Sequence, residues 1–187
     1  MLLGMAPSLL VASSPLTLPG KGLSFQEGQF AEYRSLVAVD GRTNEVMRTR
    51  FLVLKASPEF PELERVAVLS FAKDQLVKRQ IMYYDPARAP EVKGELVDTE
   101  PDVIAVGKRK IDCKKEKRVS PNGTALTWTS TSVPVSGVVR TEISSEGKTL
   151  ISELLRFGPE GMSAEEINAF MDAINPLKQS SPPQKQP

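Results

Sequence analysis

The sequence lacks histidine altogether and contains a single cysteine, Cys113, among its 187 residues. Histidine is the commonest general base and the commonest metal ligand, so its absence excludes the usual catalytic triads and zinc sites. A single cysteine cannot form an intrachain disulfide, and no imidazole is present to activate its thiol. We therefore expect Cys113 to be a small buried side chain. We expect no enzyme activity, no metal and no cofactor.

An excess of one charge is also absent. Lysine and arginine total 24, and aspartate and glutamate total 23, which gives a net charge of +1. This balance provides no general attraction to nucleic acid. The hydrophobic fraction of 40% and the charged fraction of 25% are typical of a globular chain. The length suits one domain that can bury a core without a disulfide or a metal.

Long apolar runs are scarce, and the two ends of the chain differ most from the rest. Residues 1–12 carry no charge but are shorter than the roughly 20 residues of a membrane-spanning helix. They fit the apolar region of a secretory signal peptide without its basic start; the alternative is a disordered or core-packing arm. The signal-like reading favours a periplasmic or secreted protein. The expected division is a signal-like or disordered segment 1–21, a β-rich domain 22–177 and a disordered, proline-rich tail 178–187.

The body of the chain shows the two-residue periodicity of β-strands. Residues 30–39 and 45–55 flank a turn sequence at 40–44 and form the clearest hairpin. One face of its second strand is expected to hold Met47, Thr49, Phe51 and Val53. Further strands are expected at 64–72, 76–84, 103–106, 110–119, 125–131, 137–144 and 149–157.

Short turns join these strands. In the turn at 121–124, the pair Asn122-Gly123 suits positive φ at both central positions. No helical crossover separates the roughly eight to ten strands, so their pairing is expected to be antiparallel. The expected fold class is mainly β: a curved antiparallel sheet, a half-barrel or a sandwich, with one C-terminal helix packed on it.

That helix is predicted at 163–175. Ser163 and Glu166 form a capping box, and Pro176 ends the helix. Its apolar side chains recur at helical spacing at Ile167, Phe170, Met171 and Ile174. The helix is expected to act as a lid or plug against the sheet, or simply to cover core.

Large apolar side chains from the strands and the helix are candidates for lining a ligand cavity. The alternative is that they form ordinary core. The candidates are Phe51, Phe71, Tyr83, Trp128, Phe170 and Met171.

Three carboxylates, Asp98, Glu100 and Asp102, surround Pro101 in an expected loop. Paired carboxylates serve acid–base catalysis or hold calcium. The spacing lacks the glycine and the distal glutamate of a calcium loop, so a solvated acidic loop is the favoured interpretation.

Basic side chains dominate one predicted strand, in which Ile111 and Cys113 alternate with charged residues. Lysines protect an edge strand against unwanted pairing. The alternative is a patch for anionic lipid headgroups, glycans or an acidic partner. The basic residues are Lys108, Arg109, Lys110, Lys114, Lys115, Lys117 and Arg118.

The region 103–158 resembles a pattern in exported bacterial β-rich proteins of uncharacterised function. It covers about a third of the chain. In outline these proteins are similar to lipoprotein carriers of the LolA/LolB type, in which helices plug an apolar cavity in an incomplete antiparallel barrel. The residues that match the pattern are Gly107, Ile111, Cys113, Trp128, Ser130, Val133, Pro134, Gly137, Val139, Glu153, Leu154, Phe157 and Gly158.

Three functions follow as hypotheses. The favoured one is a non-catalytic cell-envelope protein that binds a lipid-like ligand or a protein partner, with peripheral membrane contact and no nucleic acid. The second is a structural subunit of an envelope assembly. The third is a carboxylate-dependent hydrolase.

Overall fold

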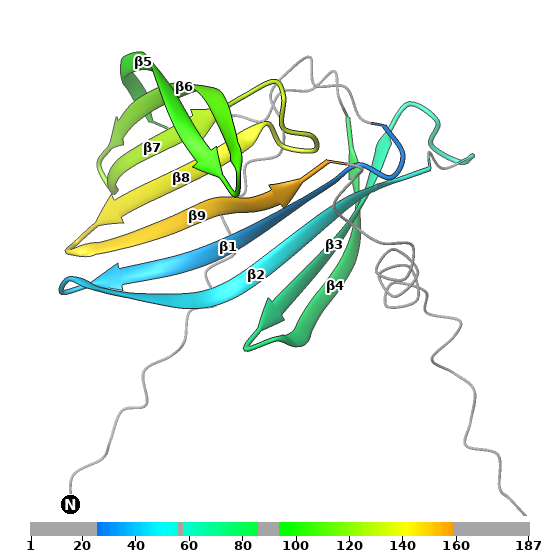
Figure 1. Cartoon of the computed structure of the whole chain (residues 1–187), viewed down its shortest axis with the longest axis horizontal. Coiled ribbons are helices and arrows are strands. Elements are labelled where there is room, and N and C mark those ends of the chain that lie inside the picture. The colour runs from blue at the N-terminus through cyan, green and yellow to red at the C-terminus, as the bar shows by residue number, and fades with distance from the viewer. Residues whose placement is uncertain (1–25, 56–57, 86–93, 159–187) are drawn as a thin grey trace, which may run out of the picture.

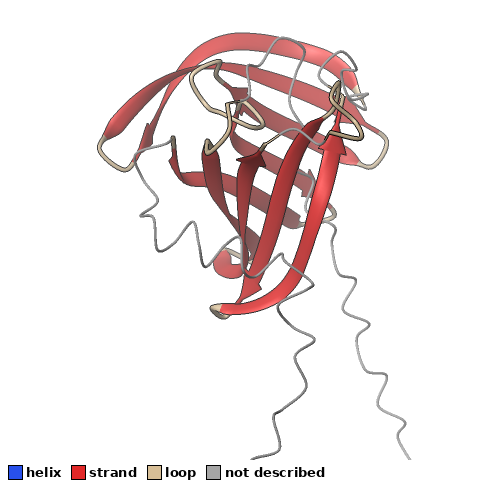
Figure 2. Ribbon diagram, turned by 90° about the vertical axis from the view of Figure 1, so that its right-hand side faces the viewer, coloured by secondary structure: helices blue, strands red, loops and turns tan. Residues whose placement is uncertain are grey.

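The computed structural model describes residues 26–55, 58–85 and 94–158. They form a single nine-stranded antiparallel sheet that remains open (Figure 1, Figure 2). The prediction of a curved antiparallel sheet is confirmed, whereas the sandwich alternative is wrong because the described strands belong to one sheet. The strands are β1 Phe30–Val39, β2 Arg42–Leu54, β3 Glu64–Ala72, β4 Gln75–Tyr84, β5 Glu95–Val106, β6 Arg109–Ser120, β7 Gly123–Thr129, β8 Val138–Ser145 and β9 Lys148–Phe157.

Two meanders make up the sheet. The strand order is β4-β3-β2-β1-β9-β8-β7-β6-β5, so each strand pairs with its sequence neighbour except where β1 meets β9. That pairing joins the first and last strands and converts two hairpin series into one sheet. The hairpin predicted at 30–55 is confirmed as β1 and β2. Of the four residues predicted to share a face of β2, Thr49, Phe51 and Val53 are buried and Met47 is half-buried, and Phe51 and Val53 belong to one buried cluster.

Tight turns link the strands. Asp40-Gly41 and Glu146-Gly147 have positive φ at both central positions, as the twist of a hairpin favours. The prediction for the β6–β7 turn is wrong in its detail. Its centre is Pro121-Asn122, and only the following Gly123 has a positive φ, of 135°. A Cβ there would lie 2.1 Å from the carbonyl oxygen of Ser144, so only glycine fits.

The acidic segment is a strand and not a loop. β5 begins at Glu95, whereas the prediction placed a strand only at 103–106. Most side chains of β5 are exposed, so its sequence shows no alternation of apolar and polar residues. Pro101 is tolerated because β5 is an edge strand of the described sheet. The prediction that the basic strand β6 is an edge strand is wrong, because β5 occupies that edge of the described sheet. β6 pairs with β5 on one side and with β7 on the other.

The sheet curls strongly, so that the β5–β6 hairpin folds over β8 and β9 (Figure 1). The end of β5 contacts β9 directly. Register shifts occur in five of the eight described strand pairs. Such bulges increase the local twist of a strand and allow a sheet to bend. The curl is what brings β5 against β9 and creates a pocket between them.

Buried apolar side chains form two clusters. In the first cluster, Phe51 and Val53 join residues from β1, β3, β5, β6, β7, β8 and β9, including Tyr33, Val106, Ile111, Cys113, Trp128, Val139 and Leu154. The second cluster contains Phe30, Leu52, Leu54, Ala67 and Leu69. Because Phe51 and Val53 alternate with Leu52 and Leu54, the two clusters lie on opposite faces of β2.

Several predictions fall outside the described residues. These are the N-terminal segment 1–21, the helix 163–175 with Phe170 and Met171, and the tail 178–187.

Candidate functional site

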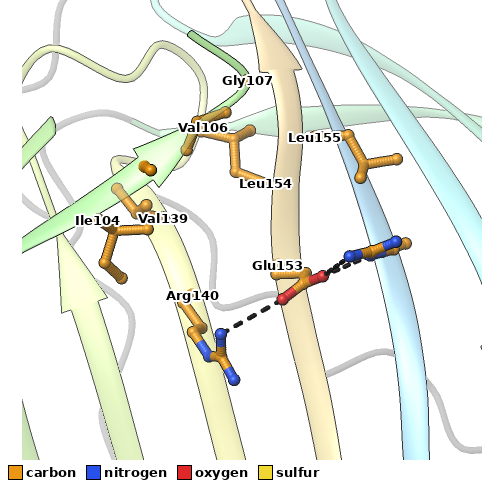
Figure 3. A pocket seen from close by; sticks show the side chains of 10 residues that line it. Ile104, Val106, Gly107, Val139, Arg140, Glu153, Leu154 and Leu155 are labelled. Atoms are coloured by element: carbon orange, nitrogen blue, oxygen red, sulfur yellow. Dashed lines mark hydrogen bonds and ion pairs between the residues drawn. The ribbon is translucent and has the colours of Figure 1, made fainter. Parts of the chain in front are cut away.

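A pocket of about 230 Å³ lies where the end of β5 approaches β8 and β9 (Figure 3). One wall is apolar, with Ile104 and Val106 from β5 facing Val139 and Leu154 from the opposite strands. The other wall is charged. The full lining is Arg34, Ile104, Ala105, Val106, Gly107, Val139, Arg140, Glu153, Leu154 and Leu155. The pocket therefore offers an apolar side and a polar side to one occupant.

Ion pairs hold the charged wall in place. Glu153 lies directly opposite Arg34 of β1 and Arg140 of β8 in the sheet register. Its carboxylate accepts from the Arg34 guanidinium through Oε1, and Oε2 lies 3.4 Å from Nη1 of Arg140. Arg140 also donates from Nε to Glu142 at 2.7 Å. Cross-strand pairs of opposite charge stabilise a sheet, so the register itself preorganises this wall.

A second ion-pair group extends the charged row toward β2. Glu32 is only 4% exposed, and its Oε2 lies 2.7 Å from Nε of Arg156 and 3.1 Å from Nε of Arg50. A buried carboxylate requires such partners, because an unpaired charge there would be costly. The row of charges on β2, β1, β9 and β8 is therefore a fixed polar surface beside the apolar core.

Trp128 links this row to β5 and β6. Its ring lies between two cations, with Arg140 at 5.8 Å and Lys115 at 5.5 Å from the ring centroid. Its indole Nε1 donates to Oδ2 of Asp102 at 2.7 Å. That bond, followed by the bond from the Val103 amide, lowers the pKa of the Asp102 carboxyl below its ordinary value. Asp102 is thus held ionised as an acceptor.

The loop between β7 and β8 fixes the other side of the core. The Tyr33 hydroxyl donates to the carbonyl oxygen of Val138 at 2.8 Å and lies 2.6 Å from Oγ of Ser136. Burial raises the pKa of Tyr33, so the phenol stays protonated. Val135 has a φ of 70° inside a three-residue turn closed by the bond from Ser136 N to Pro134 O. A β-branched residue rarely adopts this conformation, so the surrounding contacts must hold the loop in place.

The three predicted carboxylates lie on one strand, but each accepts a hydrogen bond from a different donor. Asp98 and Glu100 are exposed, and each of the three accepts a bond from its own donor. Those donors are Thr99 N for Asp98, Lys115 Nζ for Glu100, and Trp128 Nε1 for Asp102. The described residues also hold no group of three or more cysteine, aspartate or glutamate side chains arranged for a metal ion.

The seven predicted basic residues are divided between the two faces of β6 and the turn before it. Lys110 and Lys114 alternate with the buried Ile111 and Cys113, as the sequence predicted for one buried and one charged face. Two of the cations are paired with Glu116, at 2.7 Å for Lys114 and 3.4 Å for Arg118. Lys115 lies 2.7 Å from Glu100. Lys108, Arg109 and Lys117 are exposed, and Arg109 also stacks over the Phe157 ring at 5.4 Å.

The predicted cavity-lining residues that the structure describes lie in different parts of the core. Phe51 and Trp128 belong to the first cluster, whereas Phe71 packs against the second. Tyr83 is 46% exposed and packs edge-on against Phe60. None of these four lines the pocket described above. Phe170 and Met171 lie outside the described residues.

Sequence reasoning proposed none of the pocket-lining residues as a site, although Gly107, Val139, Glu153 and Leu154 occur in the pattern that the chain resembles. Arg34 and Glu153 occupy alternating positions in predicted strands, so their charge was visible but their pairing was not. Only the contact between β1 and β9 places them together. Cys113 is buried, as predicted, and burial raises the pKa of its thiol. Within the described chain, no helix has the length and apolar character needed to cross a bilayer.

No protein-family model and no curated protein matches the chain. Three solved structures share part of its outline. A candidate lipoprotein from Parabacteroides distasonis is 13% identical with a TM-score of 0.49, covering 75% of this chain and 99% of its own. A candidate exported protein with a YmcC-like fold from Bacteroides fragilis is 15% identical with a TM-score of 0.45, covering 74% and 99%. A LolA superfamily protein from Nitrosomonas europaea is 10% identical with a TM-score of 0.24, covering 76% and 90%.

Proposed function

We propose that this protein is a non-catalytic binding module of the cell envelope whose pocket between β5 and β9 takes one end of a lipid-like amphiphile. The observation that carries the proposal is the two-sided lining of the pocket. Ile104, Val106 and Leu154 form an apolar wall beside the paired guanidinium groups of Arg34 and Arg140. Binding sites of this kind combine apolar contact area with a few fixed polar groups.

The polar end of the ligand is an anionic head, a carboxylate or a phosphate. Arg34 is 42% exposed on its side chain and uses Nε and Nη2 on Glu153. Its Nη1 makes no hydrogen bond or ion pair within the described residues. A guanidinium has five N–H donors, and carboxylates and phosphates fit its geometry well. An anionic head can therefore add to the existing ion pair at Arg34.

The apolar end is short, or only partly enclosed. A volume of about 230 Å³ is smaller than the roughly 300–1,000 Å³ typical of pockets that enclose a drug-sized ligand. The pocket thus holds the head and the first part of an acyl chain. The separate hydrogen-bond partners of Asp98, Glu100 and Asp102 support a binding role over hydrolysis.

Titration calorimetry with decanoate and with decanol tests this function. We expect decanoate to bind more tightly than decanol, because only the carboxylate pairs with Arg34. Arg34→Gln should remove most of that preference. Ile104→Asp should abolish binding by placing a charge in the apolar wall.

A matched control lies next to Ile104. Val103 is 54% exposed on the same edge strand, so Val103→Asp should bind decanoate like the unaltered protein. Absence of decanoate binding by the unaltered protein would contradict the proposal. Equal losses in Ile104→Asp and Val103→Asp would also contradict it, because the pocket would then not be the site.

The second candidate is a subunit of an envelope assembly. Leu96 and Val97 of β5 and Val119 of β6 are each 40–51% exposed at the end of the β5–β6 hairpin that lies away from its turn. Exposed apolar side chains that adjoin one another mark interaction surfaces. Size-exclusion chromatography with light scattering, on the full chain and on Val97→Ser, distinguishes an assembly subunit from a monomeric binding module.

A further inference from the structure

The wall that β5 contributes to the pocket continues into a carboxylate. Ile104 lines the pocket, and Asp102 lies two residues before it on the same strand. In the register with β6, Ile104 lies opposite Ile111. Asp102 lies opposite Cys113, and no register shift separates the two pairs. Because side chains alternate along a strand, Asp102 projects from β5 on the same face as Ile104.

Trp128 connects this carboxylate to the charged wall of the pocket. Its indole Nε1 donates to Oδ2 of Asp102 at 2.7 Å, and its ring centroid lies 5.8 Å from the guanidinium carbon of Arg140. Arg140 lines the pocket together with Arg34 (Figure 3). One ring therefore lies against an anion from β5 and a cation from β8, so charges of both signs border the same pocket.

Asp102 has acceptor capacity that its neighbours do not use. Among the residues that the structure describes, it forms no ion pair and accepts only from Trp128 Nε1 and the Val103 amide. A carboxylate offers about four lone-pair sites, so roughly half of them stay open. Glu100, the next carboxylate on that face, is instead paired with Lys115 at 2.7 Å. Asp102 is half-buried, and the indole hydrogen bond lowers its pKa, so it remains an ionised acceptor.

We propose that the pocket selects an amphiphile whose head carries a phosphate followed by a primary ammonium group, as phosphoethanolamine does. The phosphate pairs with Arg34, the ammonium donates to Asp102, and the start of the chain lies against Ile104. A zwitterionic head gains a charge-assisted hydrogen bond at Asp102, whereas a purely anionic head meets a like charge there. This inference rests on the proposed binding function and adds to it the requirement for a positive group in the ligand.

Three phosphodiesters with the same decyl chain test the head group by titration calorimetry on the unaltered full chain. Decyl phosphoethanolamine ends in an ammonium group, decyl phosphoglycol has a hydroxyl in its place, and decyl phosphocholine has a trimethylammonium that cannot donate a hydrogen bond. We expect the phosphoethanolamine to bind about tenfold more tightly than either analogue, because only its ammonium is both charged and a donor. Equal affinity for the phosphoethanolamine and the phosphoglycol would overturn the proposal.

A variant of Asp102 tests whether this carboxylate is the group that recognises the ammonium. Asp102→Asn keeps an oxygen that accepts the indole hydrogen bond but removes the charge, so the tenfold preference should disappear. Asp112→Asn is the matched control, because it makes the same charge change at an exposed position on the opposite face of β6 and should keep the preference. A preference that survives in Asp102→Asn, or that is lost equally in both variants, would overturn the proposal.

Decanoate separates failure of this inference from failure of the proposed function. Binding of decanoate without discrimination among the three phosphodiesters would leave the pocket a lipid-like site and overturn only the requirement for an ammonium. Absence of binding by decanoate and by all three phosphodiesters would overturn both. Free phosphoethanolamine, which has no chain, should not bind detectably. An affinity equal to that of its decyl derivative would show that the pocket takes a soluble head group, and would overturn the proposal.

Discussion

β3 and β6 occupy equivalent places in the sheet, each second from an edge, yet their burial differs. In β3, the five consecutive residues from Val66 to Ser70 are buried. In β6, Ile111 and Cys113 are buried while Lys110, Asp112 and Lys114 are exposed. The position of a strand in the sheet therefore does not determine its burial. Its burial depends on what packs against each of its faces.

The sequences of these two strands already record the difference. A continuous apolar run is typical of a strand covered on both faces, and strict alternation is typical of a strand with one wet face. VAVLS in β3 follows the first rule, and KIDCK in β6 follows the second. The two meanders joined by the β1–β9 contact thus differ in burial: β3 of the first is buried on both faces, and β6 of the second is buried on one.

The largest expected effect is in β3. Leu69→Ala should lower the free energy of unfolding by about 2–5 kcal/mol, because it leaves a cavity in the second cluster. Lys110→Ala in β6 should change it by less than about 0.5 kcal/mol, because that side chain is exposed. Urea denaturation at neutral pH measures both, and equal losses would remove the distinction between the two strands.

Tyr33, on β1 where the first meander pairs with the second, should give the next largest effect. Tyr33→Phe deletes the hydroxyl that contacts Ser136 of the β7–β8 loop and removes its hydrogen bond to Val138 O. We expect a loss of about 1–3 kcal/mol in the free energy of unfolding. Tyr83→Phe is the control, since its ring is half exposed and its change should be within about 0.5 kcal/mol. A loss for Tyr33→Phe no larger than the control's would show that the loop is held by packing alone.

Glu116 of β6 tests whether charges on the solvent-exposed face of this strand contribute to the stability of the protein. The hydrogen bond from Lys114 lowers the pKa of Glu116 below its ordinary value of 4.5. Its contribution to stability is therefore present above pH 4.5 and is lost as the pH falls through the lower, folded-state pKa. Glu116→Gln should cost at most about 1 kcal/mol at neutral pH. The difference in the free energy of unfolding between this variant and the unaltered protein should disappear as the pH is lowered. A difference that persists in acid would indicate that Glu116 acts through packing.

The smallest effect concerns a pKa and not stability. Trp128→Phe removes the main cause of the lowered pKa of Asp102, so that pKa should rise toward its ordinary value of 3.8. Carboxyl NMR titration measures it. Val103→Ala keeps both hydrogen bonds to Asp102 and should leave its pKa unchanged. An unchanged Asp102 pKa in Trp128→Phe would mean that the backbone amide alone sets it.

Much of the fold could be predicted from local pattern. Strand alternation and turn residues identified the β1–β2 hairpin, the antiparallel pairing and the buried face of β6. Prediction failed for β5, where exposed residues on an edge strand carry no burial pattern. Prediction also failed to find the pocket, because Ile104, Arg34 and Glu153 are far apart in the chain and form no recognisable sequence motif.

The sequence by itself determined that strands form, that they pair with their neighbours, and that histidine chemistry is absent. Those properties depend on neighbouring residues or on composition. Only the tertiary structure decided that β1 pairs with β9 and that the sheet bends until β5 meets β9. The physical reason is that long-range register and bulge position depend on contacts between residues far apart in the chain, and no local stretch of sequence specifies those contacts.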